Sequence, residues 1–334
     1  MAISPMAGRL RAKTALAGSS VPQLVIGLAV AAAVAVIGIL HFQDVSAGGQ
    51  SLAEADIEWL VLAGSATVAI WLVCTVTQFG SMPTLIPFRR VFAVQVAAQF
   101  LNHLLPAGAG GIAVNVRFLQ RHGMKRAAAV GSVGLNSLAG MVTHLILLAG
   151  ALAISPAMLD NVKSQVPAMG RRVGAFGLWL GLAAVVAALA LAAFVARRGW
   201  ERVKSGGARA LRELKALAEV LRHPARASAL WLGSLTVPLL HSLILYAVLR
   251  GVGASIGLVA VAVIYVVVSS LSAAVPAPGG IGALDVMLIA AFIAAGVSSP
   301  DAWAAVVGYR LLTVWVPLLP GAMVFALLLR RRII

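Results

Sequence analysis

Long apolar stretches separated by short basic segments are the feature that most limits what this chain can fold into. Six stretches are each close to the roughly 20 apolar residues that a helix needs to cross a bilayer; they cover residues 22–42, 57–79, 127–154, 173–196, 228–249 and 301–329. Charged residues make up only 11% of the 334 residues, whereas soluble domains carry about 25%. The sequence therefore predicts an all-α polytopic membrane protein with about six full transmembrane helices.

Two further apolar regions, 91–116 and 257–298, are interrupted by proline and glycine. The first contains LPAGAGGIA and the second VPAPGGIGA. An unpaired backbone N–H or C=O is costly in hydrocarbon, so such a break is tolerated only inside protein or beside a water-filled cavity. Paired interruptions in two halves of a chain point to a binding site near the membrane midplane. We expect two broken helical hairpins; for 257–298, a re-entrant pair and two full crossings both stay open.

The distribution of Lys and Arg predicts the orientation in the membrane. If 91–116 returns to the side from which it came, one side of the membrane carries 21 basic residues and the other side carries 4. If 91–116 crosses once, everything downstream is reversed and the counts become 9 and 16. Basic residues collect in cytoplasmic loops. The hairpin is therefore favoured, with both termini in the cytoplasm.

We expect a single membrane domain over residues 1–334, with residues 1–21 as a cytoplasmic tail. The cytoplasmic loop 197–226 is basic, and its leucines fall on one helical face. It is either a helix lying in the membrane interface or a solvated connector. The basic charge lies between apolar stretches, which is typical of membrane topology and argues against nucleic acid as a partner. The lone cysteine, Cys74, argues against a disulfide or a zinc cluster.

Few ionisable residues fall within the apolar segments, and each is a candidate for function because charge is costly in hydrocarbon. Asp285 follows the second break, and Arg310 lies on the next span at a depth that an arginine side chain can match. We expect that the two can form a buried ion pair, which either locks two helices together or contacts substrate. The remaining ionisable candidates are His103, His144 and His241.

The glycines at the breaks are also candidates, because backbone N–H groups freed there suit an anionic headgroup. Polar and small residues recur every four positions on 127–154 and either hold helices together or face substrate. Arg117, Arg121 and Lys125 recur in the same way and suit lipid phosphate, although the topology rule alone also places basic residues there. These considerations add Gly108, Gly110, Gly111, Asn136, Gly279, Gly280 and Gly282 to the candidate site.

Two stretches together resemble the flippase-like membrane region of the lysylphosphatidylglycerol synthase family: FLNHLLPAGAGGIAVNVRFLQRHGMKRAAA and PAPGGIGALDVMLIAAFIAAGVSSPDAWAAVVGYRLLTVWVPLLPG. The resemblance covers most of the chain from about residue 60 onward. It adds Asn102, Asn115, Arg117, Pro278 and Tyr309 to the candidate lipid-binding residues. The chain departs from the family pattern in two ways. Asp285 stands where the family usually has Glu, and Asn115 and Asn136 stand in regions where it often has acidic residues.

The resemblance implies that the protein moves or binds a lipid. In bifunctional members of the family a separate soluble domain makes the aminoacylated lipid, and this chain ends at LLLRRRII without one. We therefore expect a flippase-like transporter of a lipid with an anionic headgroup, either a phospholipid or a polyprenyl-phosphate-linked sugar. We expect no enzymatic activity, no cofactor and no metal.

Two other classes of function stay open. The first is a non-transporting accessory subunit of a membrane glycosyltransferase or lipid synthase. The second is a membrane-embedded enzyme, which is disfavoured because no carboxylate pair, metal-ligand spacing or activated nucleophile is evident. The sequence is also compatible with a homo-oligomer.

Cysteine labelling tests the predicted orientation. In a Cys74→Ser background, a cysteine at Gln120 should react with an impermeant thiol reagent only after the membrane is opened, because the basic segment around it is cytoplasmic. A cysteine at Ser164 should react in intact cells and serves as the control. Labelling of the Gln120→Cys protein in intact cells would contradict the hairpin at 91–116.

Overall fold

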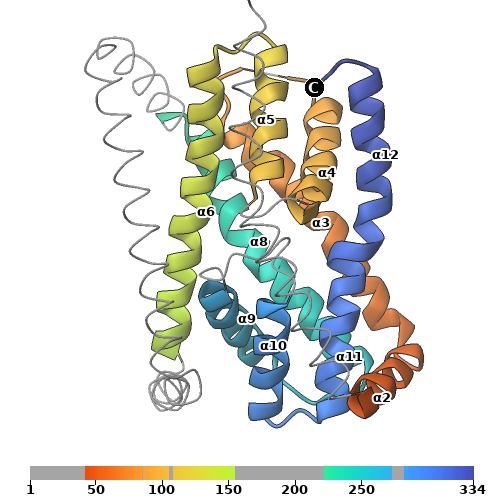
Figure 1. Cartoon of the computed structure of the whole chain (residues 1–334). Helices are drawn as coiled ribbons and strands as arrows, with labels where there is room; N and C mark the ends of the chain where they lie inside the picture. Colours follow the sequence, from red (N-terminus) through yellow and green to blue (C-terminus); the bar gives the residue numbers. More distant parts are fainter. Residues whose placement is uncertain (1–41, 85, 105–107, 155–221, 273–281) are drawn as a thin grey trace, which may run out of the picture.

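The computed structural model describes residues 42–84, 86–104, 108–154, 222–272 and 282–334, and the regular elements within these residues are helices (Figure 1). Four of the described helices are long and apolar enough to cross a membrane: α3 (Ile57–Ser81), α6 (Arg126–Ile154), α8 (Pro224–Gly251) and the continuous helix Ser299–Arg330. They agree with four of the predicted spans, with ends that differ by a few residues. The predicted spans 22–42 and 173–196 and the loop 197–226 fall largely outside the described residues.

Helices α3 and α8 pack against each other along their length and form the centre of the bundle. Small residues allow this approach, as is common between membrane helices. A Cβ atom at Gly80 would lie 2.5 Å from the backbone nitrogen of Leu230, and one at Gly233 would collide with the side chain of Thr77. At the other end of the pair, the N–H of Asp56 donates to the carbonyl of Gly251 at 2.9 Å.

The two broken regions are helical hairpins that enter the bundle from opposite ends (Figure 1). The first consists of α4 (Phe88–Leu104) and α5 (Ala109–Arg121), and the second of α9 (Leu258–Ser272) and α10 (Ala283–Ala294). The longest of these arms has 17 residues, about 26 Å at 1.5 Å per residue, which is shorter than the roughly 30 Å of a bilayer core. The first hairpin is longer than the predicted 91–116, because its second arm continues through Arg117 to Arg121.

The second half of the described chain repeats the first half in the opposite direction. The order of elements is a long helix, a broken hairpin and another long helix in both halves: α3, α4–α5 and α6, then α8, α9–α10 and α11–α12 (Ser299–Arg310 and Val316–Arg330). Contacts follow the same scheme, since α4 packs on α12 as α9 packs on α6. Inverted repeats of this kind place a binding site between them in many transporters.

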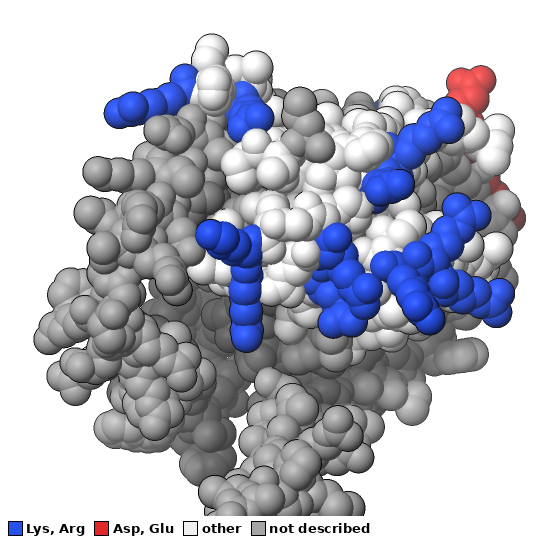
Figure 2. Space-filling view, turned by 90° about the horizontal axis from the view of Figure 1, so that it is seen from above, with Lys and Arg blue, Asp and Glu red and all other residues white. Residues whose placement is uncertain are grey.

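The two ends of the molecule differ in charge. Figure 2 looks onto the end where the C-terminus lies, and Lys and Arg side chains are spread over this face. The helix ends that meet here carry the exposed residues Arg89, Arg90, Arg117, Arg121, Lys125, Arg126, Arg330, Arg331 and Arg332. The described helix ends at the other side of the molecule include Glu54, Asp56, Glu58 and Asp301 beside Arg250.

Helix α2 (Phe42–Ala53) is an element that the sequence pattern did not predict. Its two glycines are poor helix formers. The helix packs on α11, and a Cβ atom at Gly48 would lie 2.7 Å from the carbonyl oxygen of Pro300. The helical conformation of α2 is therefore stabilised by its contact with α11, a segment far along the chain, and not by the helix propensity of its own residues.

Two glycines of α3 give a matched test of the central helix pair. Gly80→Ala should lower the free energy of unfolding by about 1–3 kcal/mol, because the new methyl group overpacks the contact with Leu230. Gly64→Ala should be neutral or stabilising by up to about 1 kcal/mol, since nothing lies within 4 Å of its added Cβ atom. Unfolding of both variants in one detergent measures the difference. Equal stabilities would contradict the close packing of α3 on α8.

Candidate functional site

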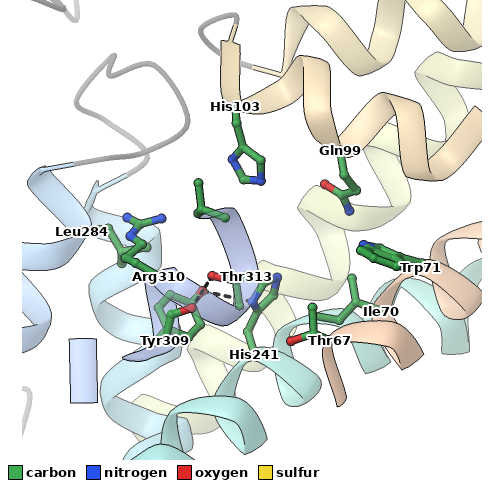
Figure 3. Close-up of a pocket in the computed structure, with 11 residues that line it drawn as sticks. Thr67, Ile70, Trp71, Gln99, His103, His241, Leu284, Tyr309, Arg310 and Thr313 are labelled. Atoms are coloured by element: carbon green, nitrogen blue, oxygen red, sulfur yellow. Dashed lines mark hydrogen bonds between the residues drawn. The ribbon is translucent and has the colours of Figure 1, made fainter. Parts of the chain in front are cut away.

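A cavity of about 190 Å³ lies in the middle of the bundle, between α3, α4, α8 and the junction of α11 with α12 (Figure 3). Four of the predicted site residues line it: His103, His241, Tyr309 and Arg310. The other lining residues were not predicted, and they are Thr67, Ile70, Trp71, Gln99, Leu284, Thr313 and Val314.

A π-helical turn, η1 (Leu311–Trp315), follows Arg310 and joins α11 to α12. Turns of this type inside α-helices are frequent at functional sites, because they change which side chains share a face. The hydroxyl of Thr313 donates to the carbonyl of Tyr309 at 2.7 Å within this turn. Tyr309 and Arg310 before this turn, and Thr313 and Val314 within it, all line the same cavity.

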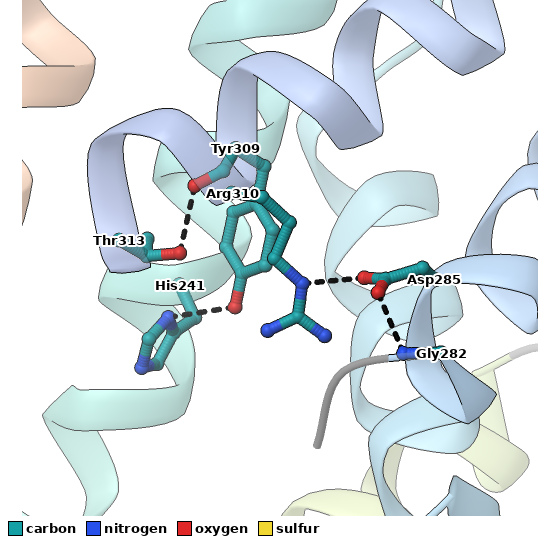
Figure 4. Close-up of polar contacts among 6 residues, drawn as sticks. All are labelled: His241, Gly282, Asp285, Tyr309, Arg310 and Thr313. Atoms are coloured by element: carbon teal, nitrogen blue, oxygen red, sulfur yellow. Dashed lines mark hydrogen bonds and ion pairs between the residues drawn. The ribbon is translucent and has the colours of Figure 1, made fainter. Parts of the chain in front are cut away.

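Asp285 and Arg310 form an ion pair beside the cavity (Figure 4). The Nε of Arg310 lies 2.5 Å from Oδ1 of Asp285, and the two side chains are only 11% and 15% exposed. The other carboxylate oxygen of Asp285 accepts from the backbone N–H of Gly282 at 2.8 Å. Gly282 begins α10 with φ of 103°, a conformation that favours glycine. Asp285 therefore holds both the arginine and the start of α10.

This geometry corrects one expectation. The backbone N–H of Gly282 was expected to face a ligand, but it donates a hydrogen bond to the carboxylate of Asp285. In the first break, the N–H of Gly111 is likewise taken, by Oδ1 of Asn102 at 2.7 Å. Side chains of the protein therefore satisfy these two amides, as a low-dielectric interior requires. Pro278, Gly279 and Gly280 lie outside the described residues.

His241 is packed among aromatic rings at the base of the cavity. Its Nδ1 lies 3.0 Å from the hydroxyl of Tyr309, and its ring stacks on Tyr265 with 5.6 Å between centroids. The guanidinium of Arg310 lies 5.8 Å from the centre of the Tyr309 ring, within the range of a cation–π contact. The cavity wall here is one connected set of polar and aromatic groups.

The remaining predicted residues of the first break hold its two arms together. The amide of Asn115 donates to the carbonyl of Gly111 at 2.9 Å and accepts from Gln95 at 2.9 Å. Gly108 begins α5 with φ of 67°, and a Cβ atom at Gly110 would collide with the backbone of Leu101. These residues position α4, which carries Gln99 and His103 into the cavity.

Two predicted residues of α6, Asn136 and His144, contact other helices and are not among the residues that line the cavity. Nδ2 of Asn136 donates to Oε1 of Gln78 on α3 at 3.0 Å, and Nε2 of His144 lies 3.2 Å from the hydroxyl of Ser269 on α9. Arg117 also lies away from the cavity, exposed on α5. The structure thus gives Asn136 and His144 the role of helix–helix contacts, one of the two readings that their spacing left open.

The spans and the two hairpins around a polar cavity define a multi-pass helical membrane protein. The chain belongs to the family described as lysylphosphatidylglycerol synthase TM region, whose model matches residues 24–321. This confirms the family that the two sequence stretches predicted. A membrane region of this family is implicated in lipid handling. A comparison with curated proteins found no match.

A double-mutant cycle tests the ion pair. Asp285→Asn or Arg310→Gln alone should each cost about 3–5 kcal/mol of stability, because one buried charge is left without its counter-charge. The double variant removes both charges and should recover much of the loss. Arg330→Gln, at an exposed helix end, is the control and should change stability by no more than about 0.5 kcal/mol. Thermal unfolding in detergent measures all four; a double variant no more stable than the worse single would show that the two residues do not pair.

Proposed function

We propose that the protein is a flippase-like transporter that moves a lipid with an anionic headgroup, a phospholipid or a polyprenyl-phosphate-linked sugar, across a bacterial cytoplasmic membrane. The observation that carries this proposal is the central cavity, which is lined by Arg310. Membership in a family whose membrane region is implicated in lipid handling supports the same function.

The proposed role of the cavity is to hold the headgroup while the hydrocarbon tails stay in the bilayer. A guanidinium binds phosphate through a planar set of donors. The carboxylate of Asp285 fixes the orientation of Arg310 through Nε. An ionised group at membrane depth is costly when it has no counter-charge. In this proposal the carboxylate of Asp285 compensates the charge of Arg310, so a cation can be kept in the interior of the bundle to bind phosphate.

The proposed movement uses the inverted repeat. The hairpins α4–α5 and α9–α10 are re-entrant in this proposal, each dipping from one face of the membrane to the cavity. Opening of one hairpin and closure of the other would expose the cavity to the two leaflets in turn. The basic end of the molecule faces the cytoplasm, together with both termini. The process involves no covalent chemistry, so the protein is not an enzyme and needs no cofactor.

Translocation in proteoliposomes tests this function. Fluorescent phosphatidylglycerol in the inner leaflet should become accessible to dithionite when the wild-type protein is present. In a second arm, the outer-leaflet fraction of polyprenyl-phosphate-glucose is followed by lectin binding. The Asp285→Asn/Arg310→Gln double variant should fold yet lose at least about tenfold in rate, because the cation that meets the phosphate is gone. Arg330→Gln should keep the wild-type rate.

The contrary outcomes are distinct. A wild-type protein that moves neither lipid would contradict transport. If it nevertheless retained lipid through purification, the non-transporting accessory subunit would become the better description. A double variant with the wild-type rate would remove Arg310 from the proposed site.

A further inference from the structure

The cavity wall away from Arg310 carries neutral hydrogen-bonding groups that the ion pair does not use. In Figure 3, Arg310 lies at one side of the cavity, and Trp71 lies at the opposite side with Gln99 and Thr67 near it. His103 points into the space between them from the end of α4. These four neutral residues lie on α3 and α4, whereas the arginine lies on α11.

Several polar atoms of these residues lack a close hydrogen-bond partner among the described residues. The Nδ1 atom of His103 is buried and has no hydrogen-bond partner among the described residues. Among the described residues, the side-chain amide of Gln99 donates only to the sulfur of Cys74, a long contact of 3.8 Å. The hydroxyl of Thr67 donates to the carbonyl of Ala63 at 3.1 Å, so its oxygen is left to accept. Buried polar groups normally have partners, which indicates that a ligand completes this set.

The mixture of donors and acceptors identifies the chemistry of that ligand. A fully ionised phosphate near Arg310 only accepts hydrogen bonds, so by itself it would leave the acceptors of His103 and Thr67 unmatched. An ammonium group would match acceptors, but it would lie beside the Arg310 cation, and none of the described lining residues is acidic. A hydroxyl group both donates and accepts, so several hydroxyls on one headgroup match the neutral wall.

The size and the aromatic side of the cavity agree with this chemistry. Sites for whole drug-sized molecules occupy about 300–1,000 Å³, and this cavity of about 190 Å³ holds a smaller group, such as one ring or a short polyol. Trp71 offers a flat apolar face and one N–H donor, which suits a carbon skeleton that carries hydroxyls on its edge.

We propose that the cavity selects a phosphate-linked polyol or sugar. The phosphate lies towards Arg310, the hydroxyls lie towards Gln99, His103 and Thr67, and the carbon skeleton packs on Trp71. This inference rests on the proposed function, because it assumes that the cavity holds a lipid headgroup. It adds that recognition of the headgroup comes from the neutral wall on α3 and α4, while the arginine supplies affinity for phosphate.

Lipid binding to the purified full-length protein tests this selectivity without requiring transport. Native mass spectrometry gives dissociation constants for phosphatidylinositol and phosphatidylglycerol, which carry polyols, and for phosphatidic acid and phosphatidylethanolamine, which do not. A parallel arm compares polyprenyl-phosphate-glucose with polyprenyl phosphate. We expect at least one lipid with a polyol or sugar to bind about tenfold tighter than the lipid of the same arm that lacks it. The arm in which this occurs identifies the type of lipid tail.

A variant assigns the preference to the neutral wall. Gln99→Leu should weaken binding of the preferred lipid about threefold to tenfold, as expected for loss of one or two hydrogen bonds, and leave phosphatidic acid binding unchanged. Gln50→Leu makes the same substitution on exposed α2 and should change neither. If Gln99→Leu does not fold, Thr67→Val keeps the shape of the side chain and removes one acceptor.

The outcomes separate this inference from the proposed function. Equal binding of phosphatidylinositol, phosphatidylglycerol and phosphatidic acid, without preference in the polyprenyl arm, overturns the inference even if the protein transports lipid. Binding of phosphatidylethanolamine as tight as that of the polyol lipids also overturns it. A polyol preference that Gln99→Leu removes supports the inference even in a protein that translocates nothing, in which case only the transport proposal fails.

Discussion

The ion pair between Asp285 and Arg310 is the interaction on which the centre of the structure depends. The carboxylate binds the arginine with one oxygen and accepts with the other from the backbone N–H of Gly282, the residue just before α10. Each group alone would be costly inside an apolar bundle, and a broken helix with an uncapped end would also be costly. One acidic side chain therefore meets both requirements, and it fixes the cation at the edge of the cavity.

The two halves of the inverted repeat each contain a broken helix whose backbone groups must be hydrogen-bonded, and they achieve this with different side chains. In the second half the break is stabilised by a charged pair, whereas in the first half it is stabilised by the neutral amides of Asn102, Asn115 and Gln95. Neutral amides satisfy backbone groups without introducing a charge that would need compensation. The fold is therefore close to symmetric while its electrostatics are not, so the cavity has a charged side and a neutral side.

Much of the fold could be predicted because its strongest constraints are local. The spans at α3, α6 and α8 follow from the length of their apolar runs, and the first hairpin follows from its Pro and Gly residues together with the charge distribution. The other features depend on partners far along the chain. Helix α2 exists because of its contact with α11, and the π turn after Arg310 has no signal in LLTVW that composition would reveal. Whether 257–298 crosses the membrane twice was open in the sequence because α9 alone is apolar enough for either arrangement.

The sequence by itself determined that this protein lies in a membrane, where its helices break and which few charged groups lie beside the breaks. These properties depend on residue type and spacing, so they can be read before folding. The tertiary structure decided which groups each of these residues contacts. Only packing shows that Gly282 donates to Asp285, that His241 contacts Tyr309, and that Trp71, Gln99 and Thr67 face one cavity. Polar side chains on apolar helices can point to lipid, to a neighbouring helix or to a cavity, and the choice is set by contacts between segments that are distant in sequence.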